Sequence, residues 1–335
     1  MTDKSDSHPY DALTPDVILD AAETYGVHCT GELMALNSYE NRVYRIGTEE
    51  QGPLAAKFYR PGRWSDDAIL EEHYFTGMLE EHEIPVVAPI VDNNGKSLNT
   101  FSGFRFALFP WQPGRVPELN RPDDFAIVGR YLGRLHALAR TEPFRYRPTI
   151  TIDSFGKEAV TYIRRNNFIP MHLEAAYDSL TAQLLQLVGQ HLDATDASNI
   201  RLHGDCHLGN ILWTETGPHI VDFDDCRMGP AIQDLWMLLS GEREEQEKQL
   251  ANILTGYLQF CDFNFSELVL IESLRTLRML HYSAWLAQRW DDPAFPIAFP
   301  WFNSTRYWEE HILSLREQQA LLSEPPLEFN RELAG

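Results

Sequence analysis

Apolar and polar residues alternate differently in the two halves of the chain. The first half contains short apolar runs typical of β-strands, at residues 42–46, 54–59, 85–90 and 103–109. Two segments in this half have the signals of helices. One starts at Thr14-Pro15, where a capping hydroxyl precedes a proline, and ends at Gly26. The other starts at Ser65 and lies between the second and third strand-like runs.

A turn-rich stretch at residues 109–114 marks the change to a helical pattern. After it, Phe125, Val128, Leu132 and Leu135 recur at helical spacing. Further helices are predicted at residues 171–190, 231–240, 244–260, 266–290 and 304–322, with one strand-rich island at 199–223. The pattern predicts an α+β fold with two lobes. Residues 1–110 would form a small β-rich lobe, and residues 111–335 a larger, mainly helical one.

Composition indicates an ordinary globular protein and argues against certain classes of binding partner. Hydrophobic residues make up 44% and charged residues 23% of the 335 residues. No apolar run reaches the roughly 18 residues that a membrane helix needs. The net charge of −21 would repel the phosphate backbone of nucleic acid and anionic membrane surfaces. We therefore expect neither nucleic acid nor membrane as a partner, and we expect a monomer.

The cysteines and the N-terminal residues bear on the cellular compartment in which the protein works. The chain has four cysteines and no CxxC pair, too few for a disulfide framework at this length. Residues 1–11 are polar and acidic and lack the apolar stretch of a secretory signal. These features predict a cytoplasmic protein.

One constellation of polar residues points to chemistry. His203-Gly-Asp205 is followed by Asn210, five residues after Asp205, and an apolar strand ends at Asp222, twelve residues after Asn210. Phosphoryl transfer needs a carboxylate that orients the acceptor hydroxyl and takes its proton, and oxygen ligands that hold Mg²⁺ against the phosphates of ATP. A loop and a hairpin of this spacing can bring the three side chains together. The spacing resembles the H-x-D-x-x-x-x-N loop of kinases and the Asp that follows it, and this resemblance implies Asp205 as the catalytic base and Asn210 and Asp222 as Mg²⁺ ligands.

Two other interpretations of the constellation stay open. Each acid could be a solvated loop residue, although that interpretation weakens when the three residues are taken together. Alternatively, His203, Cys206 and His207 could bind zinc. A structural zinc site normally takes four ligands, and Asn210 and Asp222 would then have no role.

The residues around this constellation resemble a known family. The run His203-Gly-Asp-x-His-x-Gly-Asn210, followed by Val221-Asp-Phe-Asp-Asp225, is similar to the aminoglycoside phosphotransferase and choline kinase branch of the protein-kinase-like fold. More narrowly, the chain resembles the bacterial stress response kinase A family. The segments that carry this resemblance cover nearly the whole chain and are residues 36–44, 57–61, 70–73, 129–136, 229–239, 292–296 and 324–327.

The resemblance implies a fold, an activity and a set of site residues. The small lobe of residues 1–110 would contain a small antiparallel sheet. The activity would be that of an ATP-dependent serine/threonine protein kinase that also phosphorylates itself and acts in the stress response, with a Ser/Thr-bearing protein as partner. Asp205 would accept the proton. Asp222 would serve catalysis and, with Asn210, bind magnesium, while Ser38 would contact ATP.

The nucleotide-binding residues rest on further arguments. Residues 37–41 form a polar turn where protein kinases have a glycine-rich loop, and this turn could cap a phosphate or be an ordinary hairpin turn. Lys57 lies in an apolar strand, where kinases have a lysine that pairs with the phosphates and with a glutamate of the next helix. Glu71 and Glu72 both lie on that helix. We prefer Glu72 because of its spacing to Leu79, and we assign Lys57 and Glu72 to ATP binding.

Two features of the helical half have both a structural and a functional interpretation. Asp234 resembles the helix aspartate that anchors the catalytic loop through backbone N–H groups, although an acid stabilising its own helix dipole would look the same. The aromatic residues near the C-terminus are interpreted as helix-packing core, and the alternative is a cage for a quaternary amine. These residues are Tyr282, Trp285, Trp290, Trp301, Phe302, Tyr307 and Trp308.

Two other functions also stay open. An enzyme of the same fold could phosphorylate a small alcohol such as an aminoglycoside, choline or a sugar. The acidic net charge and the aromatic residues would suit a cationic acceptor of that kind. A pseudokinase would bind nucleotide without chemistry, but the joint presence of Lys57, Asp205, Asn210 and Asp222 argues against it.

Overall fold

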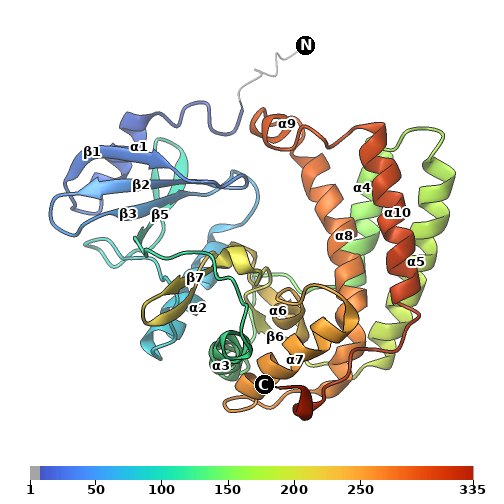
Figure 1. Cartoon of the computed structure of the whole chain (residues 1–335). Helices are drawn as coiled ribbons and strands as arrows, with labels where there is room; N and C mark the ends of the chain where they lie inside the picture. The colour runs from blue at the N-terminus through green and yellow to red at the C-terminus, as the bar shows by residue number, and fades with distance from the viewer. Residues whose placement is uncertain (1–7, 335) are drawn as a thin grey trace. The chain divides into compact units, whose positions relative to one another are not determined.

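The computed structural model describes residues 8–334. Residues 1–7 of the N-terminal stretch, which we interpreted as lacking a secretory signal, lie outside the described residues. The described part divides into two compact units, each built from segments far apart in the chain (Figure 1). Unit 1 contains the residues up to Glu118 together with Phe144–Arg147 and Leu208–Cys226. Unit 2 contains Leu119–Pro143, Pro148–His207 and the residues from Arg227 on.

Unit 1 is built on an antiparallel sheet. Within residues 8–334 this sheet has five strands in the order β1-β2-β3-β5-β4. The strands are β1 (Cys29–Ala35), β2 (Arg42–Thr48), β3 (Leu54–Phe58), β4 (Asn99–Phe101) and β5 (Phe104–Pro110). Strand β3 is central, and its Lys57 lies opposite Val43 of β2 and Ala107 of β5. The sheet therefore holds Lys57 between two hydrogen-bonded neighbouring strands.

Helices of unit 1 begin where their capping residues predict. Helix α1 (Pro15–Glu23) starts after Thr14, whose hydroxyl accepts the amide hydrogen of Val17 at 3.3 Å. Helix α2 (Asp66–Glu81) starts after Ser65, whose hydroxyl accepts the amide hydrogen of Ala68 at 3.2 Å. The apolar face of α1 packs on the sheet, with the buried residues Ile18, Ala21, Ala22, Ile46, Phe58 and Phe106 forming one core.

The prediction of a strand at residues 85–90 is wrong. These residues, all within the described part, form no strand and contribute only an isolated bridge from Val86 to Ile220. Pro85 and Pro89 lack the amide hydrogen that a ladder needs, which explains why an apolar run fails to pair here. Strands β1 and β4 have no counterpart among the predicted runs. Most of β1 is exposed, so it shows no apolar alternation.

The strand-rich island at residues 199–223 is divided between the two units. In unit 2, β6 (Ile200–Leu202) pairs with β9 (Arg227–Gly229). In unit 1, β7 (Ile211–Thr214) and β8 (Gly217–Ile220) form a hairpin whose register places Ile211 opposite Ile220. Because the chain turns back in this hairpin, the residues that follow β8 return to the segment that precedes β7.

Unit 2 is mainly helical. Its helices are α3 (Pro122–Ala139), α4 (Glu158–Arg165), α5 (Glu174–Ala194), α6 (Ile232–Trp236), α7 (Arg243–Tyr257), α8 (Ile271–Gln288), α9 (Ala294–Ala298) and α10 (Thr305–Leu321). Helices α4, α5, α8 and α10 run side by side and share one core (Figure 1). Phe302 and Trp308 are buried in that core, which confirms for these two residues that the C-terminal aromatics pack helices.

The observed elements confirm the predicted fold class, because a small antiparallel sheet is joined to a mostly helical remainder. The five later helices correspond to α5, α6, α7, α8 and α10, whereas α4 and α9 were not predicted. The compact units assign residues 111–118 and 208–226 to unit 1, so they do not follow the chain order of the predicted lobes. The division at residues 110 and 111 stays a prediction.

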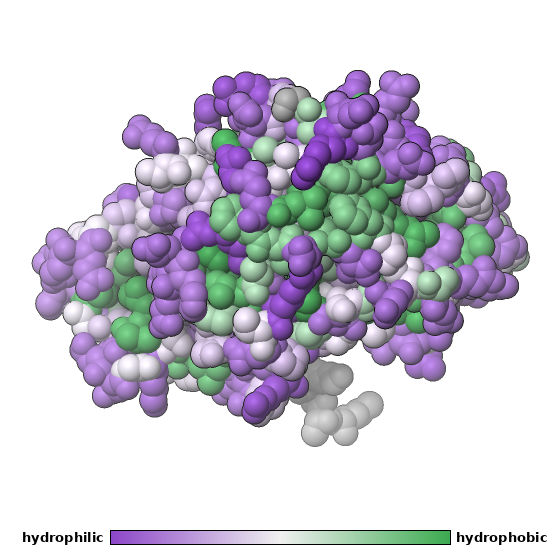
Figure 2. Space-filling model, turned by 90° about the horizontal axis from the view of Figure 1, so that it is seen from below, coloured by the Kyte–Doolittle hydropathy of each residue, from purple (hydrophilic) through white to green (hydrophobic). Residues whose placement is uncertain are grey.

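The surface agrees with the charged composition. Hydrophilic residues cover much of the face shown in Figure 2, and hydrophobic residues lie among them. Within residues 8–334, none of the helices combines the length and the apolar character that crossing a membrane requires.

Candidate active site

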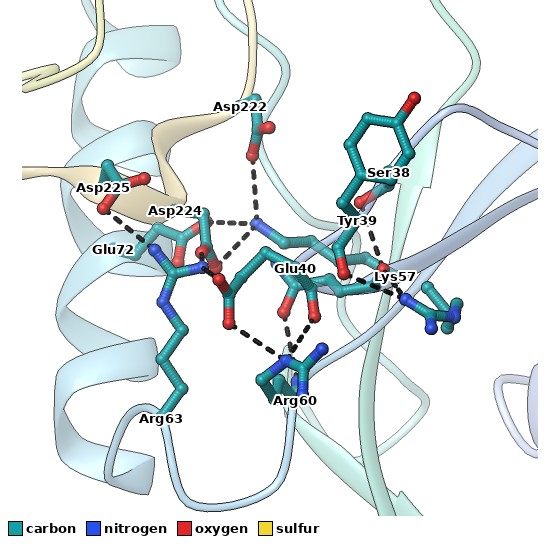
Figure 3. A network of polar contacts seen from close by, with 12 residues as sticks. Ser38, Tyr39, Glu40, Lys57, Arg60, Arg63, Glu72, Asp222, Asp224 and Asp225 are labelled. Atoms are coloured by element: carbon teal, nitrogen blue, oxygen red, sulfur yellow. Dashed lines mark hydrogen bonds and ion pairs between the residues drawn. The ribbon is translucent and has the colours of Figure 1, made fainter. Parts of the chain in front are cut away.

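Lys57 is the centre of a cluster of acids in unit 1 (Figure 3). Only 6% of this residue is exposed. Its Nζ lies 3.1 Å from Oε1 of Glu72, 3.2 Å from Oδ1 of Asp224 and 3.4 Å from Oδ1 of Asp222. Burial acts to lower the pKa of Lys57, but Asp224 and Glu72 outweigh burial and hold that pKa above its ordinary value. The side chain is therefore a fixed ammonium.

Glu71 and Glu72 have different tasks on α2. Glu72 is buried, and each of its carboxylate oxygens has its own partner. Oε1 binds Lys57, and Oε2 lies 2.8 Å from Nη2 of Arg147. Glu71 instead accepts the backbone amide hydrogens of Arg145, Tyr146 and Arg147. The structure thus pairs Lys57 with Glu72, and Glu71 holds a loop in place.

Asp222 sits at a strained backbone position directly after β8. Its φ of +62° and ψ of +66° are left-handed, a conformation uncommon for residues other than glycine but tolerated best by Asp and Asn. Asn210 ends the 3₁₀ turn Leu208–Asn210 that precedes β7, and its carbonyl accepts the amide hydrogen of Val221 at 3.0 Å. The hairpin therefore brings the segments of Asn210 and Asp222 together within unit 1.

The acids after β8 contact two arginines, Arg63, whose side chain is 11% exposed, and the buried Arg147. Nη1 of Arg63 lies 2.6 Å from Asp224, and its Nη2 lies 2.9 Å from Asp225. Arg147 donates through Nη1 to the carbonyl of Asp224. Burial acts to raise the pKa of Asp224, but Arg63 and Lys57 lower it to about 2. Desolvation and the nearby Asp224 raise the pKa of Asp222, whereas Lys57 acts to lower it.

Sequence reasoning missed Arg63, Arg147 and Asp224 as members of this network. The run of acids Asp222-Phe-Asp224-Asp225 was visible as a cluster that needs cations, so it could have prompted a search for arginines. Nothing in the neighbourhood of Arg63 or Arg147 marks either one, because their partners lie far away in the chain. Arg147, for example, is 75 residues from Glu72.

The polar turn at residues 37–41 connects β1 and β2 (Figure 3). The hydroxyl of Ser38 donates to the carbonyl of Asn41 at 3.2 Å, and Oδ1 of Asn41 accepts the amide hydrogen of Arg60 at 3.1 Å. Glu40 lies 3.1 Å from Nε of Arg60 and 3.4 Å from Nη1 of Arg63. Through Arg63 the turn is linked to the acids after β8. The turn is a tethered hairpin connection, and the hydroxyl of Ser38 bonds back within it.

In unit 2, Asp234 of α6 holds the loop that carries Asp205. Asp234 is fully buried and accepts the amide hydrogens of His203 and Gly204, both at 2.8 Å. Nε2 of His136 lies 3.1 Å from the same carboxylate. Gly204 has a φ of +85°, which favours glycine in this loop. The predicted anchoring of the loop by Asp234 through backbone N–H groups is confirmed.

His203 supports the loop from inside. It is fully buried, and its Nδ1 accepts the amide hydrogen of Asp205 at 3.3 Å. Burial keeps the pKa of Cys206 well above its ordinary value. Among the described residues, no group of three or more His, Cys, Asp and Glu side chains could hold a metal ion, so the zinc interpretation gains no support.

Asp205 itself has two basic neighbours in unit 2. Its Oδ1 lies 2.6 Å from Nη1 of Arg278 of α8, and its Oδ2 lies 3.5 Å from Nε2 of His207. The carboxylate side chain is 24% exposed, so it lies in part on the surface of its unit. Sequence reasoning did not single out Arg278.

The chain is similar to known kinases along nearly all of its length. The sequence model of a family described as "Phosphotransferase enzyme family" matches residues 32–268. Stress response kinase A of Escherichia coli is 45% identical over 320 residues, which cover 96% of this chain and 97% of that protein. Serine/threonine protein kinase RdoA of Salmonella typhimurium is 44% identical with the same coverage.

A solved structure shares the fold. Amicoumacin kinase hAmiN, in complex with AMP-PNP, Ca²⁺ and Ami, aligns with a TM-score of 0.73 over 95% of this chain and 96% of that one. The two sequences are 20% identical, so this similarity concerns the fold alone.

Proposed function

Since the chain belongs to the phosphotransferase enzyme family and, within it, to the stress response kinase A family, we propose that it is a serine/threonine protein kinase. It has the protein-kinase-like fold that the resemblance implied, and it is a phosphotransferase. The proposal adds the Ser/Thr acceptor on a protein, autophosphorylation and a role in the bacterial stress response. The name of the Salmonella typhimurium relative supports the choice of acceptor.

The cluster around Lys57 is the observation that carries the proposal. A buried ammonium held by Glu72 beside Asp222 is the arrangement that kinases use to bind the phosphates of ATP next to a metal ligand. In a purely structural role, an ion pair of Lys57 with Glu72 would suffice. The additional acids, one of them at a strained backbone position, favour binding of a further cation together with the nucleotide.

The residues present fit a divalent metal. Asn210 and Asp222 offer an amide and a carboxylate oxygen, which are ligands suited to Mg²⁺. Desolvation, together with the nearby carboxylates of Asp224 and Glu72, raises the pKa of Asp222, and a bound cation relieves an environment of this kind. We assign Asn210 and Asp222 to Mg²⁺. A bound Mg²⁺ would neutralise negative charge on the phosphates.

The proposed reaction transfers the γ-phosphoryl of ATP to a hydroxyl. Lys57 binds and orients the phosphates, with Glu72 fixing its position, and Ser38 of the turn contacts ATP. Asp205 orients the acceptor hydroxyl and takes its proton. The bond from the acceptor oxygen to the γ-phosphorus forms while the bond from that phosphorus to the bridging oxygen breaks, and ADP leaves.

The test uses ATP labelled at the γ-phosphoryl group. The protein is incubated alone, with generic Ser/Thr protein substrates and with a panel of amino alcohols, each with Mg²⁺ and with a chelator in excess. We expect label on the protein itself and on Ser/Thr substrates, and no label once the metal is removed. Label on a small molecule alone would overturn the protein-kinase assignment, and nucleotide binding without any transfer would indicate a pseudokinase.

A second candidate is a kinase that acts on a small hydroxyl compound. The alignment with amicoumacin kinase over nearly the whole of both chains is the observation that favours it. The amino alcohol panel in the same experiment separates the two candidates. We further propose a cytoplasmic monomer, and light scattering of the purified protein measures its oligomeric state directly.

A further inference from the structure

The carboxylate of Asp205 has a basic group close to each of its oxygens. Arg278 lies 2.6 Å from Oδ1, and His207 lies 3.5 Å from Oδ2. The side chains of Arg278 and His207 are 38% and 41% exposed, so both reach the surface of unit 2. An acceptor hydroxyl that approaches Asp205 therefore approaches a guanidinium as well.

Arg278 is part of a stripe of basic and aromatic residues along one face of α8. This α8 stripe recurs at intervals of three and four residues and consists of Arg275, Arg278, Tyr282, Trp285 and, just after the helix, Arg289. Tyr282 stacks on Trp285 with ring centres 5.7 Å apart, and Arg289 lies 5.4 Å over the ring of Trp285. From Arg275 to Arg289 the stripe spans about 21 Å at 1.5 Å per residue, the reach of roughly six extended residues.

The α8 stripe gathers three arginines on a strongly acidic protein, two of them beside an acid: Arg278 pairs with Asp205, and Arg275 with Glu272. The chain has a net charge of −21, from which a cationic acceptor would be expected. Beside Asp205, however, the guanidinium of Arg278 repels an ammonium group and attracts a carboxylate. Arginine also presents several N–H donors in a planar arrangement that matches a carboxylate. The surroundings of the base thus favour an acceptor that is anionic next to its hydroxyl.

We propose that the α8 stripe binds the acceptor polypeptide and that Arg278 selects Ser or Thr residues flanked by Asp or Glu. The inference rests on the proposed protein-kinase function. In the bound state, the acceptor hydroxyl donates to Asp205 while a neighbouring acidic side chain accepts N–H groups of Arg278. The aromatic residues farther along the stripe support the extended segment that follows.

The test compares two peptides of about twelve residues, each with a single Ser, flanked by Glu in one and by Lys in the other. Their kcat/KM values are measured with the full-length wild type, Arg278→Gln, Arg278→Lys and the control Arg306→Gln. Arg306 pairs with Glu310 on the exposed face of α10 and is outside the stripe. The readout is the ratio of the two kcat/KM values, which a general loss of folding or catalysis leaves unchanged.

We expect the wild type to prefer the Glu-flanked peptide, and Arg278→Gln to lower the ratio by up to about fivefold, the upper end of what one partly exposed ion pair contributes. Arg278→Lys should retain most of the preference, and Arg306→Gln all of it. Equal kcat/KM values in the wild type, or an unchanged ratio in Arg278→Gln, would overturn the inference while leaving the kinase function intact.

A wild type that phosphorylates neither peptide would contradict the proposed function, and binding then decides the inference separately. Fluorescence anisotropy with labelled peptides and AMP-PNP gives their affinities. Tighter binding of the Glu-flanked peptide, lost in Arg278→Gln, supports the stripe as an acidic-peptide site. Equal affinities for the two peptides overturn it.

Discussion

Asp234 accepts the backbone amide hydrogen of His203 at 2.8 Å, across 31 residues of the chain. The second oxygen of the same carboxylate accepts the amide hydrogen of Gly204. Because the carboxylate is fully buried, each of these charge-assisted hydrogen bonds is shielded from water. The position of the loop before Asp205 therefore depends on a side chain of another element.

Replacing Asp234 by Asn should loosen this loop and destabilise the fold. The amide side chain has one acceptor oxygen where two backbone donors need an acceptor, and its NH₂ group would face a donor. We expect a loss of about 2–4 kcal/mol in the free energy of unfolding, measured by urea denaturation, together with loss of transfer. The control is Asp193→Asn, since Asp193 is an exposed acid of α5, and this change should leave stability unaltered. Equal stability of the two variants would show that the anchoring contributes nothing.

Asp205→Asn should separate nucleotide binding from chemistry. The change keeps the size of the side chain and removes its ability to take a proton. We expect ATP binding in a thermal-shift assay close to that of the wild type, and a transfer rate lower by roughly 10² to 10⁴. Transfer at a near wild-type rate would show that Asp205 is not the base.

Lys57→Met should abolish productive ATP binding. The substitution removes the cation that Glu72, Asp222 and Asp224 surround and leaves these acids to repel the phosphates. We expect transfer to fall on the order of 10² or more, as when an electrostatic donor is removed from an active site. The matched control is Lys157→Met, since Lys157 is exposed and pairs with Asp153 one helical turn away. Normal transfer by Lys57→Met would remove the main support for the proposed function.

Glu71 and Glu72 provide a pair of neighbouring variants with different expected defects. Glu72→Gln removes a buried charge from between Lys57 and Arg147, so transfer by the folded protein should fall steeply. Glu71→Gln weakens the hydrogen bonds to the amides of residues 145–147 and should cost about 1–2 kcal/mol of stability while retaining transfer. Activity per folded molecule, compared with the unfolding midpoint in urea, distinguishes the two. Equal loss of transfer in both variants would contradict the separate roles.

His311 should make stability depend on pH. Burial lowers its pKa from 6.5 to about 4. As the pH falls below about 6.5, the unfolded chain takes up the proton before the folded one does, so the free energy of unfolding decreases. The decrease should reach about 1.5 kcal/mol between pH 6.5 and pH 5. Urea unfolding at both pH values should show a smaller pH dependence in His311→Gln than in the wild type, whereas the exposed His172→Gln should behave like the wild type.

How much of the structure could be predicted from the sequence differs from residue to residue. Thr14 and Ser65 were found because a helix cap is a local event, in which a hydroxyl binds an amide three residues on. The run at residues 85–90 misled because apolar character alone does not show whether the backbone has hydrogens to donate. Edge strand β1 was not predicted because most of its residues are exposed and show no alternation of apolar and polar side chains.

For the candidate site, the sequence by itself determined which chemistry was available. Short stretches of the chain contain the patterns that indicate this chemistry. They are the spacing of Asp205, Asn210 and Asp222, and the lysine in an apolar strand. Asp234 could be named from its helix, but its bonds to His203 and Gly204 required the structure.

Only the tertiary structure decided how these residues are charged and held. Arg63, Arg147 and Arg278 meet their acids across 162, 75 and 73 residues of chain, respectively. An arginine in a sequence looks the same whether it faces water or a buried carboxylate. Its role depends on the packing of distant elements, and burial then sets how strongly it acts, because charges interact more strongly away from water.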